Sequence, residues 1–256
     1  MKRVEQIWGT AVGVEVLDDV TASVVDDVFA WFARVDELFS TWRDDSEIVR
    51  IAGGTLAICD SSVETRTVLA LCQALSAATG GAFDVSATAL RPPPHPRGWC
   101  PLDPSAVVKG WALDRAADRL RAAGVHRFCM NAGGDVLVGD RRGPGEPWRV
   151  GVQHPAERDR LAAVVAVAGA GVATSGRYER GDHIVDPRTG RPAHDLASVT
   201  VVAPDLATAD AYSTAVFALG RDGLDWLRTH PDVAAMVITD EDVVFTTAAF
   251  DRRRAA

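Results

Sequence analysis

The chain has 256 residues, of which 47% are hydrophobic, so it is long enough to bury a substantial core. It lacks the ~18 consecutive apolar residues of a membrane-spanning helix, and its net charge of −8 without a basic cluster argues against nucleic acid or an anionic membrane as the main partner. We expect one domain over residues 1–256, or two intimately packed lobes, with no nucleic-acid binding and no membrane insertion. Because the N-terminal residues lack an apolar signal region, we expect a cytoplasmic protein.

The N-terminal half predicts one strand and three helices. Residues 10–17 alternate apolar and polar side chains, as in a strand, and residues 20–42 carry apolar side chains at helical spacing. A second helix is expected to begin at a capping box of Ser61 and Glu64 and to end at Gly80-Gly81. The proline-rich segment 92–96 predicts an exposed extended loop, and a third helix covers roughly residues 107–123.

The second half predicts mainly strands, joined by Gly-Gly and Asp-Glu-Asp turns that are typical of hairpins. Long helices that alternate irregularly with antiparallel strands favour an α+β fold, with largely antiparallel sheets and packed helices, over a doubly wound parallel sheet. The predicted strands lie within residues 127–131, 135–140, 148–153, 161–169, 198–203, 234–240 and 242–247.

One helix near the C-terminus carries two polar residues in an otherwise apolar sequence. It is expected to start at Pro204-Asp205 and to end at Gly220. Asp210 and Thr214 are four residues apart, so they share one face of this largely buried helix. A buried charge needs compensation, and a divalent cation that prefers oxygen ligands would supply it. Alternatively, Asp210 caps or pairs locally and Thr214 bonds to a carbonyl one turn earlier.

Four other patterns each have two interpretations. Gly169-x-Gly171 follows a strand-like run, as in a dinucleotide-binding fold, but no amphipathic helix follows it. Asp103-Pro104-Ser105 and Lys109 begin a helix, which suits a phosphate or ribose but also an ordinary cap. Gly133-Gly134-Asp135 is either a hairpin turn or a close approach to a ligand. His183 suits proton transfer at neutral pH, although a lone histidine is usually a packed or surface residue.

Seven blocks of the sequence form one ordered series between residues 8 and 220. They are WGT (8–10), FSTWRDDSEIVRI (39–51), GAFDVS (81–86), LDPSAVVKGWALD (102–114), NAGGDVLVGD with WRVGVQHP (131–140 and 148–155), TSGRYER with HIVDPRTGRP (174–180 and 183–192), and SVTVVAP with ADAYSTAVFALG (198–204 and 209–220). Together they resemble the ApbE family of FAD:protein FMN transferases. The ordered series is a far stronger signal than any single block.

The resemblance implies an ApbE-like fold and a particular reaction. An enzyme of this kind binds FAD, splits its pyrophosphate with Mg²⁺, and joins the FMN part to a Thr or Ser hydroxyl of an acceptor protein by a phosphoester bond, releasing AMP. The expected cofactor is Mg²⁺, and the expected partners are FAD and an acceptor protein that carries a Ser or Thr flavinylation motif. A divalent ion suits this chemistry because it neutralises charge on phosphate oxygens.

Site residues follow from the resemblance by position. It implies that Asp210 and Thr214 are metal ligands together with the backbone carbonyl of Ala106, and we hypothesise that His183 transfers the proton. The expected catalytic residues are therefore His183 and Asp210. The residues expected to contact FAD are Trp8, Trp42, Phe83, Asp84, Val85, Asp103, Ala106, Lys109, Thr174 and Val185.

Departures from the family pattern concern the flavin pocket. Trp8 stands where the family has methionine, Ser86 where it has threonine, and the segment between Phe83 and Asp103 is short, with Trp99 as its aromatic residue. Two related functions stay open at this point, namely a Mg²⁺-dependent FAD pyrophosphatase that gives FMN and AMP, and a non-catalytic FAD-binding protein. A nicotinamide oxidoreductase is a more distant alternative.

Overall fold

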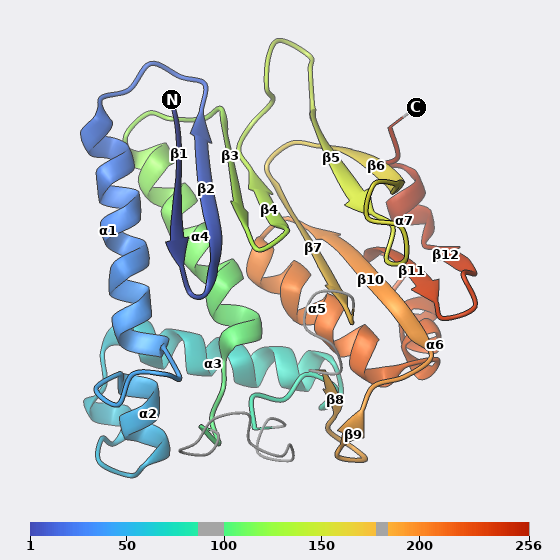
Figure 1. The fold of residues 1–256 in the computed structure, drawn as a ribbon, viewed down its shortest axis with the longest axis horizontal. Helices are drawn as coiled ribbons and strands as arrows, with labels where there is room; N and C mark the ends of the chain where they lie inside the picture. Colours follow the sequence, from blue (N-terminus) through green and yellow to red (C-terminus); the bar gives the residue numbers. More distant parts are fainter. Residues whose placement is uncertain (87–99, 178–183, 256) are drawn as a thin grey trace.

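The computed structural model describes residues 1–86, 100–177 and 184–255, and Figure 1 shows how their elements are arranged. The strands are β1 (Lys2–Ile7), β2 (Thr10–Val16), β3 (Phe128–Ala132), β4 (Asp135–Val138), β5 (Trp148–Gln153), β6 (Leu161–Val167), β7 (Ala170–Gly176), β8 (Val185–Asp186), β9 (Arg191–Pro192), β10 (Leu196–Ala203), β11 (Ala234–Thr239) and β12 (Val244–Thr246). The helices are α1 (Ala22–Phe39), α2 (Glu47–Ala52), the short 3₁₀ helix η1 (Ile58–Asp60), α3 (Val63–Ala78), α4 (Ser105–Ala122), α5 (Leu206–Leu219), α6 (Asp222–Thr229) and α7 (Ala248–Asp251).

Eight strands form one sheet in the order β1-β2-β3-β4-β7-β10-β11-β12, and each neighbouring pair is antiparallel. The hairpins β5-β6 and β8-β9 lie outside it. The predicted α+β class with largely antiparallel sheets is therefore confirmed, as are the strand within residues 10–17 and the seven strands of the second half. Local patterns in the sequence did not predict the strands β1 and β9 or the helices α2, η1, α6 and α7. No helix in residues 1–86, 100–177 and 184–255 is both long and apolar enough to cross a membrane.

The large sheet is covered on both faces. Alternate residues along a strand enter different hydrophobic clusters, because successive side chains of a strand point to opposite faces. Ala173 and Val201 belong to the cluster that contains α1, α4 and α5, whereas Val172 and Val202 belong to the cluster that contains the β5-β6 hairpin and α7. Figure 1 shows α4 and α5 behind the strands of the sheet. This layering places α5 directly against β7.

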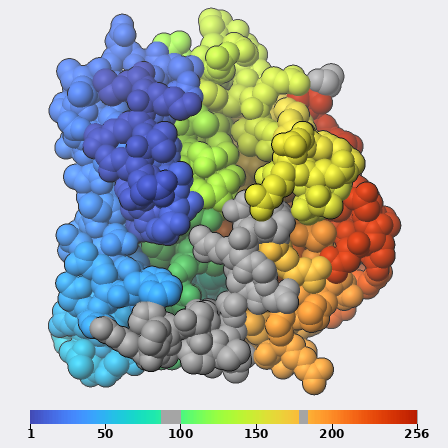
Figure 2. All heavy atoms as spheres, viewed as in Figure 1, coloured from blue at the N-terminus to red at the C-terminus, as the bar shows by residue number. Residues whose placement is uncertain are grey.

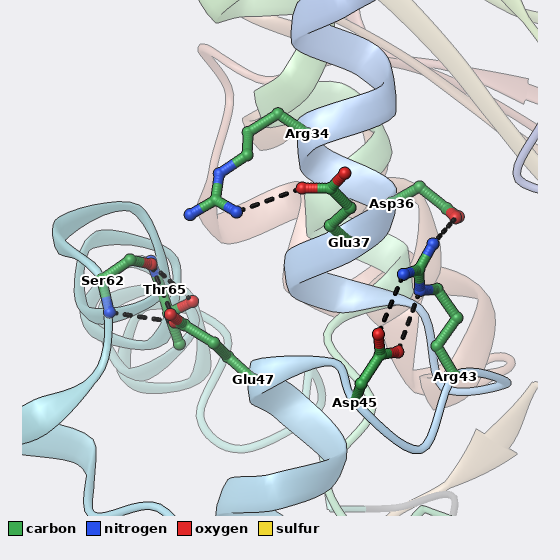
Figure 3. A network of polar contacts seen from close by, with 8 residues as sticks. All are labelled: Arg34, Asp36, Glu37, Arg43, Asp45, Glu47, Ser62 and Thr65. Carbon is green, nitrogen blue, oxygen red and sulfur yellow. Dashed lines mark hydrogen bonds and ion pairs between the residues drawn. The ribbon is translucent and has the colours of Figure 1, made fainter.

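The start of α3 differs from its prediction by one residue. Ser62 is the N-cap, and its hydroxyl accepts a hydrogen bond from the backbone N–H of Thr65 at 3.2 Å. The carboxylate of Glu47, at the start of α2, accepts hydrogen bonds from both the backbone N–H and the hydroxyl of Ser62 (Figure 3). Glu47 thus makes the capping contact that was expected of Glu64. The predicted Ser61 instead donates to the carbonyl of Ile58. A partner distant in sequence thus completes a cap that local spacing assigned to a nearby glutamate.

Two tight turns define one end of the large sheet. Trp8 and Gly9 connect β1 to β2 with φ of 56° and 70°, and Gly133 and Gly134 connect β3 to β4 with φ of 59° and 96°. Positive φ at both central residues is the geometry that two-residue hairpins prefer. Because β2 pairs with β3, these turns lie at the same end of the sheet, where β4 begins. In Figure 2 the β1-β2 hairpin (dark blue) and the β5-β6 region (yellow) stand on the two sides of the visible face.

The glycines around residue 170 have structural roles. Gly169 has a φ of 56° and precedes β7, and Gly171 lies within that strand. A Cβ at Gly171 would stand 2.6 Å from the Cα of Leu206, so glycine allows α5 to approach the sheet. The strand is followed by no helix in the described part of this segment, which removes the structural basis of a dinucleotide-binding fold here. The prediction for residues 92–96 lies outside the described residues.

Candidate active site

Polar side chains from four separate segments converge where β4 begins and β7 ends. α5 packs against β7, β10 and α4 (Figure 1). Lys109 comes from α4, Asp135 from β4, Ser175 from β7 and Asp210 from α5. The antiparallel register brings the start of β4 beside the end of β7, since Val136 pairs with Val172. The fold thus gathers groups that are far apart in sequence.

The position of α5 is fixed by close contact with α4. A Cβ on Gly110 would lie 2.7 Å from the backbone N and Cα of Ala207, a separation that real Cβ atoms essentially never show. Glycine at this point therefore lets the two helix backbones meet. One turn later, Asp114 accepts hydrogen bonds from the backbone N–H groups of Leu206 (2.9 Å) and Ala207 (3.0 Å). These amides belong to the first turn of α5, which has no acceptors within its own helix.

Asp114 is an unusual cap because its carboxyl group is largely enclosed. Burial raises its pKa to about 6, although the two backbone hydrogen bonds act in the opposite direction. The N-cap of the same helix, Asp205, accepts from the backbone N–H of Thr208 at 2.8 Å. Two carboxylates therefore serve the N-terminus of α5, where a helix dipole favours negative charge.

Three charged groups lie in contact at the centre of the site. Lys109 forms an ion pair with Asp135, and its Nζ lies 3.7 Å from Oδ2 of Asp210. The second oxygen of Asp135 accepts from the backbone N–H of Thr174 at 3.0 Å. Asp135 and Asp210 are only 2% and 6% exposed. The three groups together carry a formal charge of −1, which suits an additional cation better than an additional anion.

Hydroxyl groups continue the site along α5 and β7. The Ser175 hydroxyl lies 2.8 Å from that of Ser213 and 3.2 Å from that of Thr214, and Ser213 donates to the carbonyl of Asp210 at 2.9 Å. On the other face of β7, the Thr174 hydroxyl bonds to that of Thr200 at 2.9 Å. Asp210 and Thr214 therefore share one face of α5, as their spacing predicted, and β7 supplies the hydroxyl next to Thr214.

The chemistry of these residues fits a divalent cation that binds through oxygen. Asp210 offers a buried carboxylate, Thr214 a hydroxyl one turn later, and Ala106 lies in the first turn of α4, one turn before Lys109. Among the residues described in the structure, no three His, Cys, Asp or Glu side chains gather as a metal site. A cation here would need backbone, water or ligand oxygens as well, which is how Mg²⁺ is commonly held beside substrate phosphates.

The residues expected to contact flavin form one connected group before α4. The backbone N–H of Asp103 donates to the carbonyl of Val85 at 2.9 Å, and the Asp103 carboxylate accepts from Ser105, at the start of α4. Phe83 is 3% exposed and belongs to the main hydrophobic cluster, whereas Asp84 is exposed and accepts from Ser86. The structure thus brings residues 83–85 and 103 together beside the helix that carries Lys109.

Trp8, Trp42 and Val185 lie on other elements. Trp8 packs edge-on against Phe32, with ring centroids 5.3 Å apart, and its buried Nε1 has no hydrogen-bond partner within the described ranges. Trp42 is 69% exposed between α1 and α2. Val185 is buried in β8. His183 lies outside the described residues, so its position relative to Asp210 stays a prediction.

A guanidinium fixes the hairpin that contains Val185. Arg188 forms hydrogen bonds with both carboxylate oxygens of Asp186 and reaches Asp222, at the start of α6, at 2.9 Å. Burial alone would raise the pKa of Asp186, but the hydrogen bonds from Arg188 outweigh it and lower this pKa. The β8-β9 hairpin is thereby tied to the helix that follows α5.

Sequence reasoning missed Asp114 and gave Asp135 only as part of a Gly-Gly-Asp turn or a close approach to a ligand. Both residues lie inside blocks that resemble the family. Asp135 directly follows a Gly-Gly turn, and a charged residue at the first position of a buried strand was the available signal.

Two surface hollows in the described part of the chain lie away from these residues. One, of about 720 Å³, is lined in part by Asp18, Arg127 and Gly169, at the opposite end of the sheet. The other, of about 230 Å³, lies between α6 and β12. Neither is lined by Asp210 or Lys109, so converging charge and hydrogen bonding, rather than cavity size, identify the candidate site.

Comparison with known proteins gives a consistent result. A family model described as ApbE family matches residues 8–92 and 95–237. The FAD:protein FMN transferase of Escherichia coli (strain K12) is 36% identical over 156 residues, which cover 57% of this chain and 44% of that protein. The chain thus spans less than half the length of this curated relative. The protein of the same name from Haemophilus influenzae is 27% identical over 298 aligned positions, covering 93% of this chain and 86% of that protein.

Solved structures share the fold. The flavin transferase ApbE from Vibrio cholerae has a TM-score of 0.85 at 22% identity, covering 99% of this chain and 98% of that one. The apo flavinyl transferase ApbE of Pseudomonas stutzeri has a TM-score of 0.85 at 24% identity, covering 100% and 97%. At these identities the structures establish the architecture alone, whereas the family model covers most of the sequence. The chain therefore belongs to the ApbE family.

Proposed function

We propose that this protein is a Mg²⁺-dependent FAD:protein FMN transferase. In the proposed reaction a Ser or Thr hydroxyl of an acceptor protein attacks the phosphorus of the FMN half of FAD. The new phosphoester bond forms, the pyrophosphate bond to AMP breaks, and the hydroxyl proton passes to a base. The observation that carries this proposal is the buried Asp210, which shares a helix face with Thr214 and lies 3.7 Å from the ammonium of Lys109.

Asp210, Thr214 and the backbone carbonyl of Ala106 are the proposed protein ligands of Mg²⁺. When bound, Mg²⁺ would neutralise negative charge on the pyrophosphate oxygens. Lys109 would add a second positive charge on the same side, since its Nζ is held between Asp135 and Asp210. With Mg²⁺ bound, the formal charge of these groups would change from −1 to +1, which would neutralise part of the charge of a dianionic pyrophosphate.

His183 is the proposed base for the acceptor hydroxyl, and this assignment rests on the family resemblance. Its side chain suits proton transfer near neutral pH. The acceptor proton would pass to His183 as the phosphoester forms. Together with Asp210, it makes up the proposed catalytic pair.

The flavin and adenine parts would contact the group around residues 83–85 and 103. Support comes from the hydrogen bond that joins Asp103 to Val85 next to α4. The buried Nε1 of Trp8 offers a donor at the end of the sheet where β4 begins. The other proposed contacts are Trp42, Phe83, Asp84, Ala106, Lys109, Thr174 and Val185. We also propose that residues 1–256 form one ApbE-like domain, because both hydrophobic clusters are built on one sheet.

The test is incubation with FAD, Mg²⁺ and a candidate acceptor protein, followed by mass spectrometry and chromatography of the flavins. We expect the acceptor to gain the mass of FMN and AMP to accumulate. Free FMN with unmodified acceptor would instead indicate an FAD pyrophosphatase, and bound but intact FAD would indicate a non-catalytic flavin-binding protein.

Asp210→Ala should abolish Mg²⁺-dependent turnover while the protein stays folded. Asp205→Ala is the matched control on the same helix, because it removes an N-cap worth about 0.5–2 kcal/mol of stability without touching the proposed ligands. A folded Asp210→Ala variant with full activity would refute the metal assignment.

A further inference from the structure

The carboxylate of Asp135 bridges two elements other than its own. It is 2% exposed, forms an ion pair with Lys109 of α4, and accepts from the backbone N–H of Thr174 in β7 at 3.0 Å. A buried carboxylate is costly unless it is paired and hydrogen-bonded, and both of its oxygens meet that need here. Asp135 thus connects α4 to the end of β7.

The turn before Asp135 does not need this side chain. The backbone N–H of Gly134 donates to the side-chain oxygen of Asn131 at 3.3 Å, and both turn glycines supply the positive φ that the hairpin requires. The carboxylate of Asp135 points to α4 and β7 instead. The buried Asp135 carboxylate therefore stabilises the position of the Lys109 ammonium.

Lys109 has two carboxylates within reach. Asp135 is in direct ion-pair contact with Nζ, and Oδ2 of Asp210 is 3.7 Å away. We propose that Asp135 is a positioning residue that holds the Lys109 ammonium closer to itself than to Asp210, so that a divalent cation at Asp210 competes with only a long Lys109–Asp210 ion pair. This inference rests on the proposed function, because it takes Asp210 as a metal ligand.

The physical reason is competition between two cations for one carboxylate. If Asp135 loses its charge, Asp210 is the one of these two acids that still attracts the Lys109 ammonium, and a short side-chain movement shortens and strengthens the 3.7 Å ion pair. A divalent cation would then have to displace the ammonium. Removing a group that orients a metal ligand typically weakens metal binding roughly 10–100-fold.

The test measures Mn²⁺ binding to the protein without FAD, by calorimetry or by the EPR signal of free Mn²⁺. Asp135→Asn keeps the shape and an oxygen for the Thr174 N–H but removes the charge. We expect its Mn²⁺ affinity to fall roughly 10–100-fold. Asp18→Asn is the matched control, since Asp18 also combines backbone amides with a basic partner, Arg127, at the opposite end of the sheet. It should leave Mn²⁺ affinity unchanged.

The double variant Asp135→Asn/Lys109→Met decides how Asp135 acts. If Asp135 works through Lys109, removal of the ammonium should restore Mn²⁺ affinity to at least the wild-type value. Asp135→Asn that binds Mn²⁺ like the wild type would overturn the inference, and so would a loss that persists in the double variant. If Asp135→Asn does not fold, Lys109→Met alone gives the test, because it should bind Mn²⁺ at least as tightly as the wild type.

The two proposals fail in different ways. A wild-type protein that neither binds Mn²⁺ nor converts FAD contradicts the proposed function. A wild-type protein that converts FAD with Mg²⁺, while Asp135→Asn keeps its Mn²⁺ affinity, contradicts only the role of Asp135.

Discussion

Replacing Asp114 by asparagine should change the pH dependence of stability in a defined direction. Burial raises the pKa of Asp114 from 3.8 to about 6, against the effect of the hydrogen bonds from Leu206 and Ala207. A raised pKa in the folded state means that ionisation is harder there than in the unfolded chain. The folded state therefore binds the Asp114 proton more tightly than the unfolded chain does. This contribution to the unfolding free energy is fully present below pH 3.8 and is lost as the pH rises through about 6.

The magnitude follows from the two pKa values. The difference between 3.8 and about 6 corresponds to about 3 kcal/mol of unfolding free energy. Asparagine cannot ionise, yet it keeps one oxygen for the first turn of α5. Relative to Asp114→Asn, the wild type should thus lose about 3 kcal/mol between about pH 4 and about pH 7, with most of the change complete near pH 6.

Urea unfolding of both proteins over this pH range measures the difference directly. Asp118→Asn, an exposed position on the same helix, should differ from the wild type by less than about 0.5 kcal/mol at every pH. A constant difference for Asp114→Asn would show that this carboxyl does not control the pH dependence. If the wild type instead gained stability relative to Asp114→Asn as the pH rises, the backbone amides and dipole of α5 would lower the pKa of Asp114 more than burial raises it.

Three other substitutions test the packing and the site. Gly110→Ala should destabilise the protein by about 1–3 kcal/mol in thermal or urea unfolding, because its Cβ overlaps the backbone of α5, whereas Gly13→Ala places a Cβ 3.6 Å from one valine methyl and should cost less. Ser175→Ala should raise the Mg²⁺ concentration for half-maximal turnover, since it removes the hydroxyl 3.2 Å from Thr214; an unchanged value would exclude this contact from metal binding. His183→Ala should slow transfer by about 10²–10⁴-fold with FAD binding largely kept, and unchanged kinetics would remove His183 from the mechanism.

The sequence predicted those parts of the structure that depend on local patterns. The apolar spacing of α1, the Asp205 start and Gly220 end of α5, and the turn at Gly133-Gly134 all appear where their patterns placed them. The spacing of Asp210 and Thr214 also predicted that they share a face. In each case residues within one or two turns of each other determine the result.

Contacts between distant segments were beyond local reasoning. The N-cap of α3 is Ser62 and not the predicted Ser61, because Glu47, from another helix, hydrogen-bonds to Ser62. The partners of Asp135 were not predicted because they lie in α4 and β7, and only the antiparallel pairing of β4 with β7 brings them within reach. The ligand set, the role of His183 and the cytoplasmic location stay predictions.

The segment from Lys109 to Asp114 shows how one helix sets both halves of the candidate site. Gly110 and Asp114 are four residues apart, so both face α5, and they fix that helix by close approach and by capping its first amides. Lys109, adjacent to Gly110, reaches Asp210 one turn further along α5. The separation of Lys109 from Asp210 therefore depends on how Gly110 and Asp114 position α5 against α4. Substitutions at Gly110 or Asp114 should shift metal affinity together with stability, whereas Asp135→Asn should shift metal affinity through the ammonium of Lys109.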